Sequence, residues 1–229
     1  MRTTIRNHLD LMTIQAEVLF VHDRNGRLIG INEPDRQPAP RLFWGKTRTG
    51  DVLRFQRDVP DHTVAEIQAI MKQDETPEKL SLVIRTFEKE QSINRIWMGP
   101  AYACFTGVTS PTGAILVTEQ NQSALEAGFS RLLSELPFRK PCYMVTENDV
   151  AVSVCFCARS TDRAAEAGVE TLEDYRGRGY AALTVSSWCR AIYESQRIPL
   201  YSTSWDNYAS MSVAKRLNFT LYGTDISIY

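Results

Sequence analysis

The sequence has no marked excess of charge of either sign and no long apolar run. Lys and Arg number 26 and Asp and Glu 27, which leaves a net charge of −1. Dedicated nucleic-acid-binding domains are usually strongly basic. No stretch approaches the roughly 20 apolar residues of a membrane-spanning helix, and the opening residues have no apolar core of an export signal. We therefore expect a cytoplasmic protein that binds neither nucleic acid nor a membrane.

Cysteine and histidine are also scarce. The five cysteines are an odd number and are typical of reduced thiols rather than of a disulfide framework. Cys155 and Cys157 alternate within a predicted strand, so they share one of its faces. No histidine or third cysteine lies nearby in the sequence to complete a zinc set. We interpret both thiols as core side chains and expect no metal.

The composition is that of a folded protein with room for one large or two small domains. Hydrophobic residues make up 43% of the 229 residues and charged residues 23%. The pattern changes after about residue 80, and we place a boundary near residues 85–95. This divides the chain into an N-terminal α+β region over residues 1–90, which we expect to shape an acceptor pocket, and a second region over residues 91–229.

Charge is uneven within the N-terminal region. Residues 36–57 hold six basic residues and one acid, with three aromatic residues between them, and residues 58–78 hold six acids and one base. A basic stretch with interleaved aromatic residues is one way to bind nucleic acid. Because the charges of the two segments cancel, we favour a basic stretch that faces the acidic helix after it, or that is simply a solvated strand face.

Periodicity and turn residues predict the order of the elements. Asn25-Gly26 and Thr49-Gly50 indicate two hairpins, and Asp61 is the predicted N-cap of a helix over residues 61–73. Pro137 is expected to end another helix. The other predicted helices span residues 3–17, 123–136, 179–195 and 207–217, and the later strands span residues 95–105, 113–119, 150–158, 166–172, 198–204 and 220–229.

Residues 166–195 predict a strand, a turn with two glycines and a helix. Gly177 and Gly179 allow consecutive backbone N–H groups to point in one direction, and the following helix adds its own unpaired N–H groups. Such a turn suits a phosphate or pyrophosphate. The spacing excludes a P-loop. A dinucleotide fingerprint is matched formally, but it follows charged residues and leaves too little chain for that fold.

The run Tyr175–Ala181 resembles the pyrophosphate loop of the GNAT superfamily of acyl-CoA-dependent N-acyltransferases. The pattern Q/R-x-x-G-x-G/A of that family is matched by Arg176, Gly179 and Ala181. Downstream, Asn207-Tyr208-Ala209-Ser210 and Arg216-Leu217-Asn218-Phe219 are similar to the family's N-x-x-A/S and L-G-F segments. Asn218 replaces the usual glycine and is the next-best residue for a left-handed helix end. The resemblance covers about residues 150–225.

The resemblance implies an α/β fold in which a mixed, twisted sheet with splayed central strands is flanked by helices. It implies acetyl-CoA as acyl donor in the gap between those strands and no metal. The backbone of the entering strand would bind the pantetheine arm, and Asn207 would contact the arm or cap the last helix. The implied residues are Val169, Glu170 and Thr171 on the strand and Arg176, Gly177, Arg178, Gly179, Tyr180 and Ala181 in the loop.

The resemblance identifies the catalytic groups less directly than the donor-binding residues. A carboxylate on the entering strand would serve as general base, and Glu166 is the first candidate and Glu170 the second. The family often carries a tyrosine on the last helix as general acid, where this sequence has Ala214. That role is then vacant, or it is filled by Ser210, Tyr208 or a water. We expect Trp205 to be a core residue.

These observations predict an N-acetyltransferase that joins the acetyl group of acetyl-CoA to a primary amine of a small molecule, or of a peptide, in a ternary complex. No cysteine sits beside a histidine, which disfavours a covalent route. A non-catalytic acyl-CoA-binding or sensing module is the alternative, since Ala214 leaves the acid position without a tyrosine. A homo-oligomer is compatible with the sequence.

Overall fold

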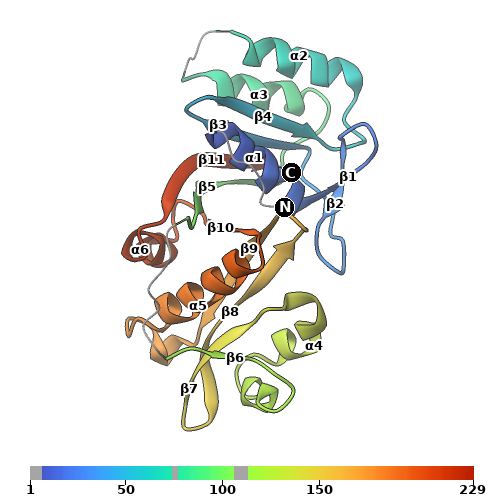
Figure 1. The fold of residues 1–229 in the computed structure, drawn as a ribbon. Coiled ribbons are helices and arrows are strands. Elements are labelled where there is room, and N and C mark those ends of the chain that lie inside the picture. Colours follow the sequence, from blue (N-terminus) through green and yellow to red (C-terminus); the bar gives the residue numbers. More distant parts are fainter. Residues whose placement is uncertain (1–6, 74–76, 106–112) are drawn as a thin grey trace.

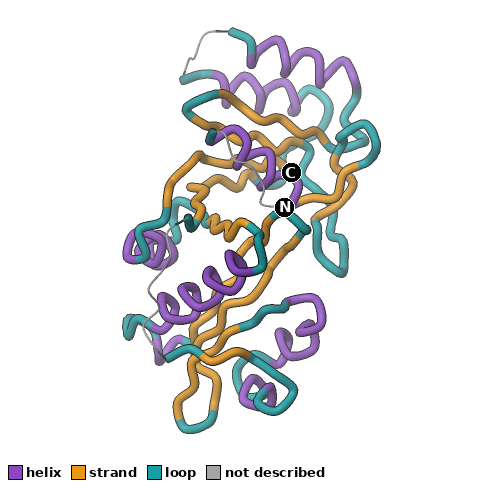
Figure 2. Tube along the Cα trace, in the orientation of Figure 1, coloured by secondary structure: helices purple, strands orange, loops and turns teal. Residues whose placement is uncertain are grey.

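A mixed sheet of nine strands forms the centre of the computed structural model, which describes residues 7–73, 77–105 and 113–229. Helices cover both faces of this layer (Figures 1 and 2). The strand order is β4-β3-β11-β5-β10-β9-β8-β7-β6, and β1 and β2 form a separate hairpin. The strands are β1 (Phe20–His22), β2 (Leu28–Ile31), β3 (Leu42–Thr47), β4 (Gly50–Phe55), β5 (Ile96–Ala103), β6 (Ile115–Leu116), β7 (Tyr143–Glu147), β8 (Val150–Ser160), β9 (Ala164–Thr171), β10 (Ile198–Ser202) and β11 (Thr220–Ile228).

The large sheet contains strands from both sides of residue 90. The N-terminal strand β3 pairs with β11, the last strand of the chain, and β11 pairs in turn with β5. The only parallel pairing in the described sheet joins β9 and β10. The division into residues 1–90 and 91–229 stays a prediction, and the hydrogen-bonded sheet runs across it.

Alternation along the strands assigns each helix to a face of the sheet. On β3, Leu42 and Trp44 pack with α2 and α3, whereas Phe43 packs with α1. On β8, Cys155 packs with α5 and Phe156 with α4. One face therefore carries α1 and α4 and the other α2, α3, α5 and α6. The helices are α1 (His8–Leu19), α2 (Asp61–Met71), α3 (Lys79–Glu88), α4 (Ser130–Arg139), α5 (Tyr180–Glu194) and α6 (Tyr208–Arg216).

Both predicted hairpins are present, and two details of the predicted N-terminal half are wrong. Pro60, not Asp61, occupies the N-cap position of α2, because the Asp61 carboxylate accepts a hydrogen bond from Arg27 at 2.6 Å instead of capping the backbone. The helix α3 was not predicted. It buries Val83 and Phe87 against α2 and the sheet, at the four-residue spacing of a helix. The first residues of the predicted helix 3–17 lie outside the described part.

The predicted helix over residues 123–136 is also wrong, because it is interrupted. A short 3₁₀ turn, Gln122–Leu125, precedes α4, and Gly128 lies between them against Leu172, where an added Cβ would stand 3.0 Å from that side chain. The prediction that Pro137 ends this helix is wrong, because α4 continues to Arg139. The Arg139 guanidinium holds this last turn in place by donating hydrogen bonds to the Ala158 carbonyl and to Glu135. The predicted strand 113–119 shortens to Ile115–Leu116.

Candidate functional site

Two neighbouring strands in the middle of the sheet part from each other. The parallel pairing of β9 with β10 covers only Ala164–Glu166 opposite Ile198–Leu200, whereas β8 stays paired with β9 as far as Thr171. Beyond Glu166, the edge of β9 that faces β10 has no strand partner in the described chain. The expected gap between splayed central strands is thus present.

The chain after β10 follows β5 instead of β9, and this accounts for the gap. Thr203 N–H donates to the Pro100 carbonyl and Trp205 N–H to the Met98 carbonyl. The crossing requires glycine at position 99, because an added Cβ there would lie 1.7 Å from the Thr203 carbonyl oxygen. The prediction that Trp205 is a core residue is wrong: its backbone pairs with β5 at the surface, and the residue is 44% exposed.

The glycine turn lies at the start of α5 and presents free amides. Gly177 and Gly179 have φ of +76° and +85°, in the left-handed region. The N–H groups of residues 177–181 have no acceptor within the described protein, whereas Ala182 and Leu183 already donate to the Gly179 carbonyl. These amides and the positive end of the α5 dipole together form a site for an anion.

A cleft of about 850 Å³ joins the parted strands to this turn, and we call it the splay cleft. It brings together most of the predicted donor-binding residues and the predicted catalytic residues Glu170 and Ser210. Arg178 does not line it; its side chain turns to Glu147 and to the Asp174 carbonyl. The predicted residues that line it are Val169, Glu170, Thr171, Arg176, Gly177, Gly179, Tyr180, Ala181, Asn207 and Ser210.

The splay cleft also holds two residues that the sequence analysis did not assign to it. Arg216, near the end of α6, places a guanidinium nitrogen 2.9 Å from where a Cβ at Gly179 would stand. Tyr201 on β10 is 4% exposed, and its hydroxyl lies 2.5 Å from the Ser210 hydroxyl. Burial raises the pKa of Tyr201, so its phenol is neutral at physiological pH. Arg216 lay within the quoted motif, but only the fold brings it to the loop.

Glu166 and Glu170 occupy different environments. Glu166 is 3% exposed at the point where the strands part, and its Oε1 accepts hydrogen bonds from Ser202 N–H at 2.6 Å and Ser202 Oγ at 2.8 Å. Its Oε2 is buried without a partner. Burial raises the pKa of Glu166, against the opposing effects of Ser202 and Arg159. Glu166 is absent from the walls of the splay cleft, whereas the exposed Glu170 lines it.

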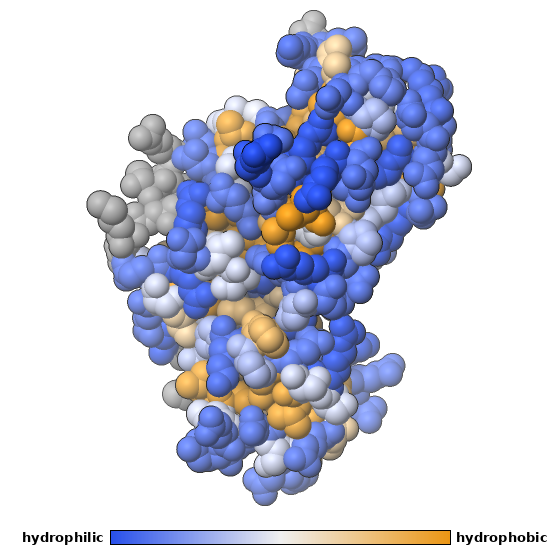
Figure 3. Space-filling model, turned by 90° about the vertical axis from the view of Figure 1, so that its right-hand side faces the viewer, coloured by the Kyte–Doolittle hydropathy of each residue, from blue (hydrophilic) through white to orange (hydrophobic). Residues whose placement is uncertain are grey.

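A second hollow of about 470 Å³ adjoins the splay cleft, and we call it the side chamber. It shares Gly128, Phe129, Val169 and Glu170 with the splay cleft. Its remaining walls come from α4, β8, Gly168 of β9 and Glu33 of the N-terminal region. Figure 3 shows hydrophobic surface in the middle of the face that lies to the right in Figure 1, on the side of α4 and the β1–β2 hairpin.

Asn207 caps α6, as one of the two predicted roles for it requires. Its Oδ1 accepts a hydrogen bond from Ser210 N–H at 3.0 Å. Ala214 is completely buried within the core beneath α5 and α6.

Within the described residues, no group of three or more His, Cys, Asp or Glu is placed to hold a metal ion. Those residues also include no helix of the length and apolarity that crossing a membrane requires.

Comparison with known proteins extends these observations. Residues 139–224 match the family model described as GNAT acetyltransferase. An acetyltransferase of the GNAT family from Colwellia psychrerythraea has 10% identity and a TM-score of 0.51, with 100% of this chain and 99% of that chain covered. A GCN5-related N-acetyltransferase from Sphaerobacter thermophilus has 14% identity and a TM-score of 0.50, with 86% and 78% covered.

Other comparisons are more limited. A GNAT-family protein from Novosphingobium aromaticivorans has 17% identity and a TM-score of 0.48, and the match covers 59% of this chain and 65% of that one. No curated protein matches the sequence significantly. At these identities the two structures with TM-scores of 0.51 and 0.50 show the fold alone, and the family model matches the segment that contains β9, the glycine turn, α5 and α6. Residues 139–224 of this chain therefore carry the sequence pattern of the GNAT acetyltransferase family, and the whole chain shares its fold with a GNAT-family structure.

Proposed function

We propose that the protein transfers the acetyl group of acetyl-CoA to a primary amine of a small molecule, or of a peptide, by direct attack in a ternary complex. The observation that carries this proposal is the set of free amides at residues 177–181, which opens onto a cleft between parted strands. The amides suit the pyrophosphate of coenzyme A, and the unpaired edge of β9 suits the amide groups of its pantetheine arm.

The donor would lie along the splay cleft. Arg176 and Arg216 add positive charge beside the amides, and Gly179 keeps the space between the loop and Arg216 open. The backbone of Val169–Thr171 would pair with the pantetheine arm in the manner of an added strand. The thioester would then reach the point where β9 and β10 part, next to Tyr201 and Ser210.

The reaction forms an amide bond from the acceptor nitrogen to the acyl carbon and breaks the bond from that carbon to sulfur. The amine must first lose a proton, and Glu170 is the carboxylate that lines the cleft. Glu166 stays a candidate base, because its raised pKa makes it a stronger base than an exposed glutamate. The amine nitrogen loses a second proton as the amide forms, and this proton would pass to the departing thiolate with the Ser210 hydroxyl, which the Tyr201 phenol contacts, as the relay.

The N-terminal region would shape the acceptor pocket through Glu33, which lines the side chamber. The side chamber meets the splay cleft at Glu170, so an amine held there would face the thioester. Holding both reactants in this geometry is worth about 7–11 kcal/mol of the barrier without any covalent intermediate. The proposal places the reaction in the cytoplasm and requires acetyl-CoA as co-substrate.

An assay of thiol release tests the proposal. Purified protein is incubated with acetyl-CoA and a panel of primary amines, and free CoA is measured against a control without amine. We expect release that depends on the amine and an acetylated product of matching mass. Glu170→Gln should lower kcat and leave the affinity for acetyl-CoA unchanged, and Glu166→Gln should shift the pH–rate profile if Glu166 is the base. No amine-dependent release across the panel would contradict the proposal.

The burial of Ala214 favours a second candidate, a non-catalytic acyl-CoA-binding or sensing module. At this position the family often carries a tyrosine, and no acid group replaces it on the same helix turn. The two candidates differ in the same experiment, because a sensor binds acetyl-CoA in calorimetry and releases no CoA with any amine.

A further inference from the structure

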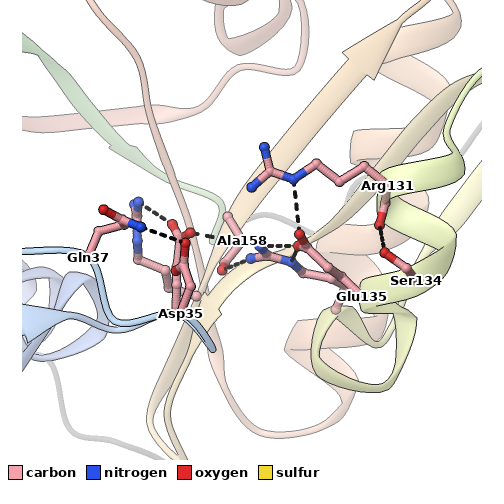
Figure 4. Close-up of polar contacts among 9 residues, drawn as sticks. Asp35, Gln37, Arg131, Ser134, Glu135 and Ala158 are labelled. Atoms are coloured by element: carbon pink, nitrogen blue, oxygen red, sulfur yellow. Dashed lines mark hydrogen bonds and ion pairs between the residues drawn. The ribbon is translucent and has the colours of Figure 1, made fainter.

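The side chamber contains a network of charged side chains that bind one another. Arg139 donates through Nε and Nη2 to Glu135 at 2.8 and 2.5 Å, and its Nη1 donates to the Ala158 carbonyl. Glu33 lies 2.5 Å from Arg159 and 3.8 Å from Arg139. Figure 4 shows this network between α4 and the neighbouring strands. These ion pairs hold the N-terminal region against α4. The charges of the four side chains are largely neutralised by one another.

Two charged groups on the walls of the side chamber remain available to a ligand. Arg131 uses only Nε, which donates to Glu135 at 3.0 Å, and the side chain is 82% exposed. Figure 4 shows the outer nitrogens of Arg131 pointing away from Glu135. Glu170 is exposed and has no ion pair or hydrogen bond to its carboxylate within the described protein. The side chamber therefore offers one free guanidinium edge and one free carboxylate.

The free carboxylate and the free guanidinium lie in different parts of the side chamber. Glu170 lies where the side chamber joins the splay cleft, whereas Arg131 belongs to α4 and lines only the side chamber. Phe129 and Phe156, which are 4% and 8% exposed, form an apolar part of the wall. A ligand that satisfies both charges presents an ammonium toward the donor, a carboxylate away from it and an apolar body between aromatic rings.

We infer that the acceptor is an amino acid with an apolar side chain, bound in the side chamber with its ammonium at Glu170 and its carboxylate at Arg131. This inference rests on the proposed function and names its substrate class. An Arg side chain with its terminal nitrogens free matches a carboxylate through two parallel hydrogen bonds. The amino group loses its proton to Glu170, attacks the thioester carbon and displaces the CoA thiolate.

The test compares amino acids with the amines that lack only the carboxylate. The pairs are phenylalanine with phenethylamine and leucine with isopentylamine, and kcat/KM is measured by CoA release. We expect the amino acid of each pair to be preferred by about tenfold or more, the size of one charge-assisted hydrogen bond. Arg131→Gln should raise KM for the amino acids, leave the two amines unchanged and so remove the preference.

Two controls accompany the variant. Arg24→Gln removes an exposed arginine from the tip of the β1–β2 hairpin and should change neither substrate of a pair. Acetyl-CoA affinity, measured by calorimetry, should be equal in Arg131→Gln and in the unchanged protein, which shows that the variant is folded. Equal kcat/KM for amino acids and amines, or an equal effect of Arg131→Gln on both, overturns this inference and leaves the proposed function standing. No CoA release with any amine or amino acid overturns both.

Discussion

Two glycines of this chain share a backbone conformation and differ in their surroundings. Gly26 and Gly179 have φ of +76° and +85°, so a side chain at either position strains the backbone to a similar extent. A Cβ at Gly26 would meet nothing within 4 Å, whereas one at Gly179 would lie 2.9 Å from the Arg216 guanidinium. Substitution at these two positions therefore separates backbone strain from loss of the anion site.

Gly179→Glu should weaken acetyl-CoA binding by at least about tenfold, because it places a bulky anion among amides and cations that would hold a diphosphate. Isothermal titration calorimetry measures the affinity. Gly26→Glu is the matched control and should bind acetyl-CoA as the unchanged protein does. If a folded Gly179→Glu variant bound acetyl-CoA with the affinity of the unchanged protein, the glycine turn would not be part of the donor site.

A second residue-level feature is a buried acid that has no part in the proposed reaction. Asp225 is completely buried; its Oδ2 accepts a hydrogen bond from Gln15 Nε2 at 2.8 Å, and its Oδ1 has no partner. Burial raises the pKa of Asp225 well above the ordinary value, and the nearby charge of Glu166 raises it further, while Gln15 and Arg159 act in the opposite direction. The folded state thus favours the neutral acid.

Because this pKa is higher in the folded state, the stability contributed by Asp225 is complete in acid below its unfolded value and is lost as pH rises through the folded value. Asp225→Asn should therefore raise the urea midpoint at neutral pH and not in acid. Urea unfolding from pH 4 to 8 measures the difference. Asp58→Asn, at an exposed position, is the control and should not change the pH dependence. A variant whose stability falls with pH as steeply as that of the unchanged protein would contradict this account.

At the scale of the element, the residue that caps α6 at its N-terminus, Asn207, has two roles. Asn207 uses its side-chain oxygen to cap the helix, and it also lines the splay cleft. A serine at the same position can still cap the helix through its hydroxyl, whereas alanine cannot. The two substitutions therefore separate the cap from any contact with the donor.

Asn207→Ala should cost about 1 kcal/mol of unfolding free energy, measured in urea, and Asn207→Ser should cost almost nothing. Both variants should weaken acetyl-CoA binding by about fivefold, because each lacks the side-chain amide that faces the cleft. If the serine variant bound acetyl-CoA with unchanged affinity, Asn207 would be a cap only.

For the whole molecule, the shared sheet predicts one cooperative unit. The core beneath α1 combines Phe43 and Val52 of the N-terminal region with Ala101, Leu200 and Tyr222 of the rest. β3 lies at the edge of the C-terminal strand β11 and is hydrogen-bonded to it over its length. Unfolding residues 1–90 alone would expose this core and leave β11 without a partner on one side.

We therefore expect the two halves to unfold together. Trp44 and Trp188 are buried in different cores, one under α2 and α3 and one under α5. Labelling with 5-fluorotryptophan gives each a separate fluorine resonance, and their midpoints in urea should coincide. Separate midpoints would show that the N-terminal region is an independent domain.

Patterns in the sequence were enough to predict the glycine turn, the helix that follows it and the order of most strands and helices around them. These signals are local: left-handed glycines, helix caps and periodicity depend on residues close in the sequence. Residues 175–181 and 207–219 were sufficient to indicate the family and its fold. The helix α3 and the interruption before α4 were missed, because packing against α2 and against Leu172 decided them.

The different surroundings of the two candidate bases, and the side chamber itself, arise only in the folded chain. Glu166 and Glu170 lie four residues apart on one strand, yet Glu166 is buried with Ser202 and Glu170 lies between two hollows. The network from Glu33 to Arg139 joins residues more than a hundred positions apart. Burial and charge pairing at that separation depend on how distant strands meet, and no local pattern contains that information.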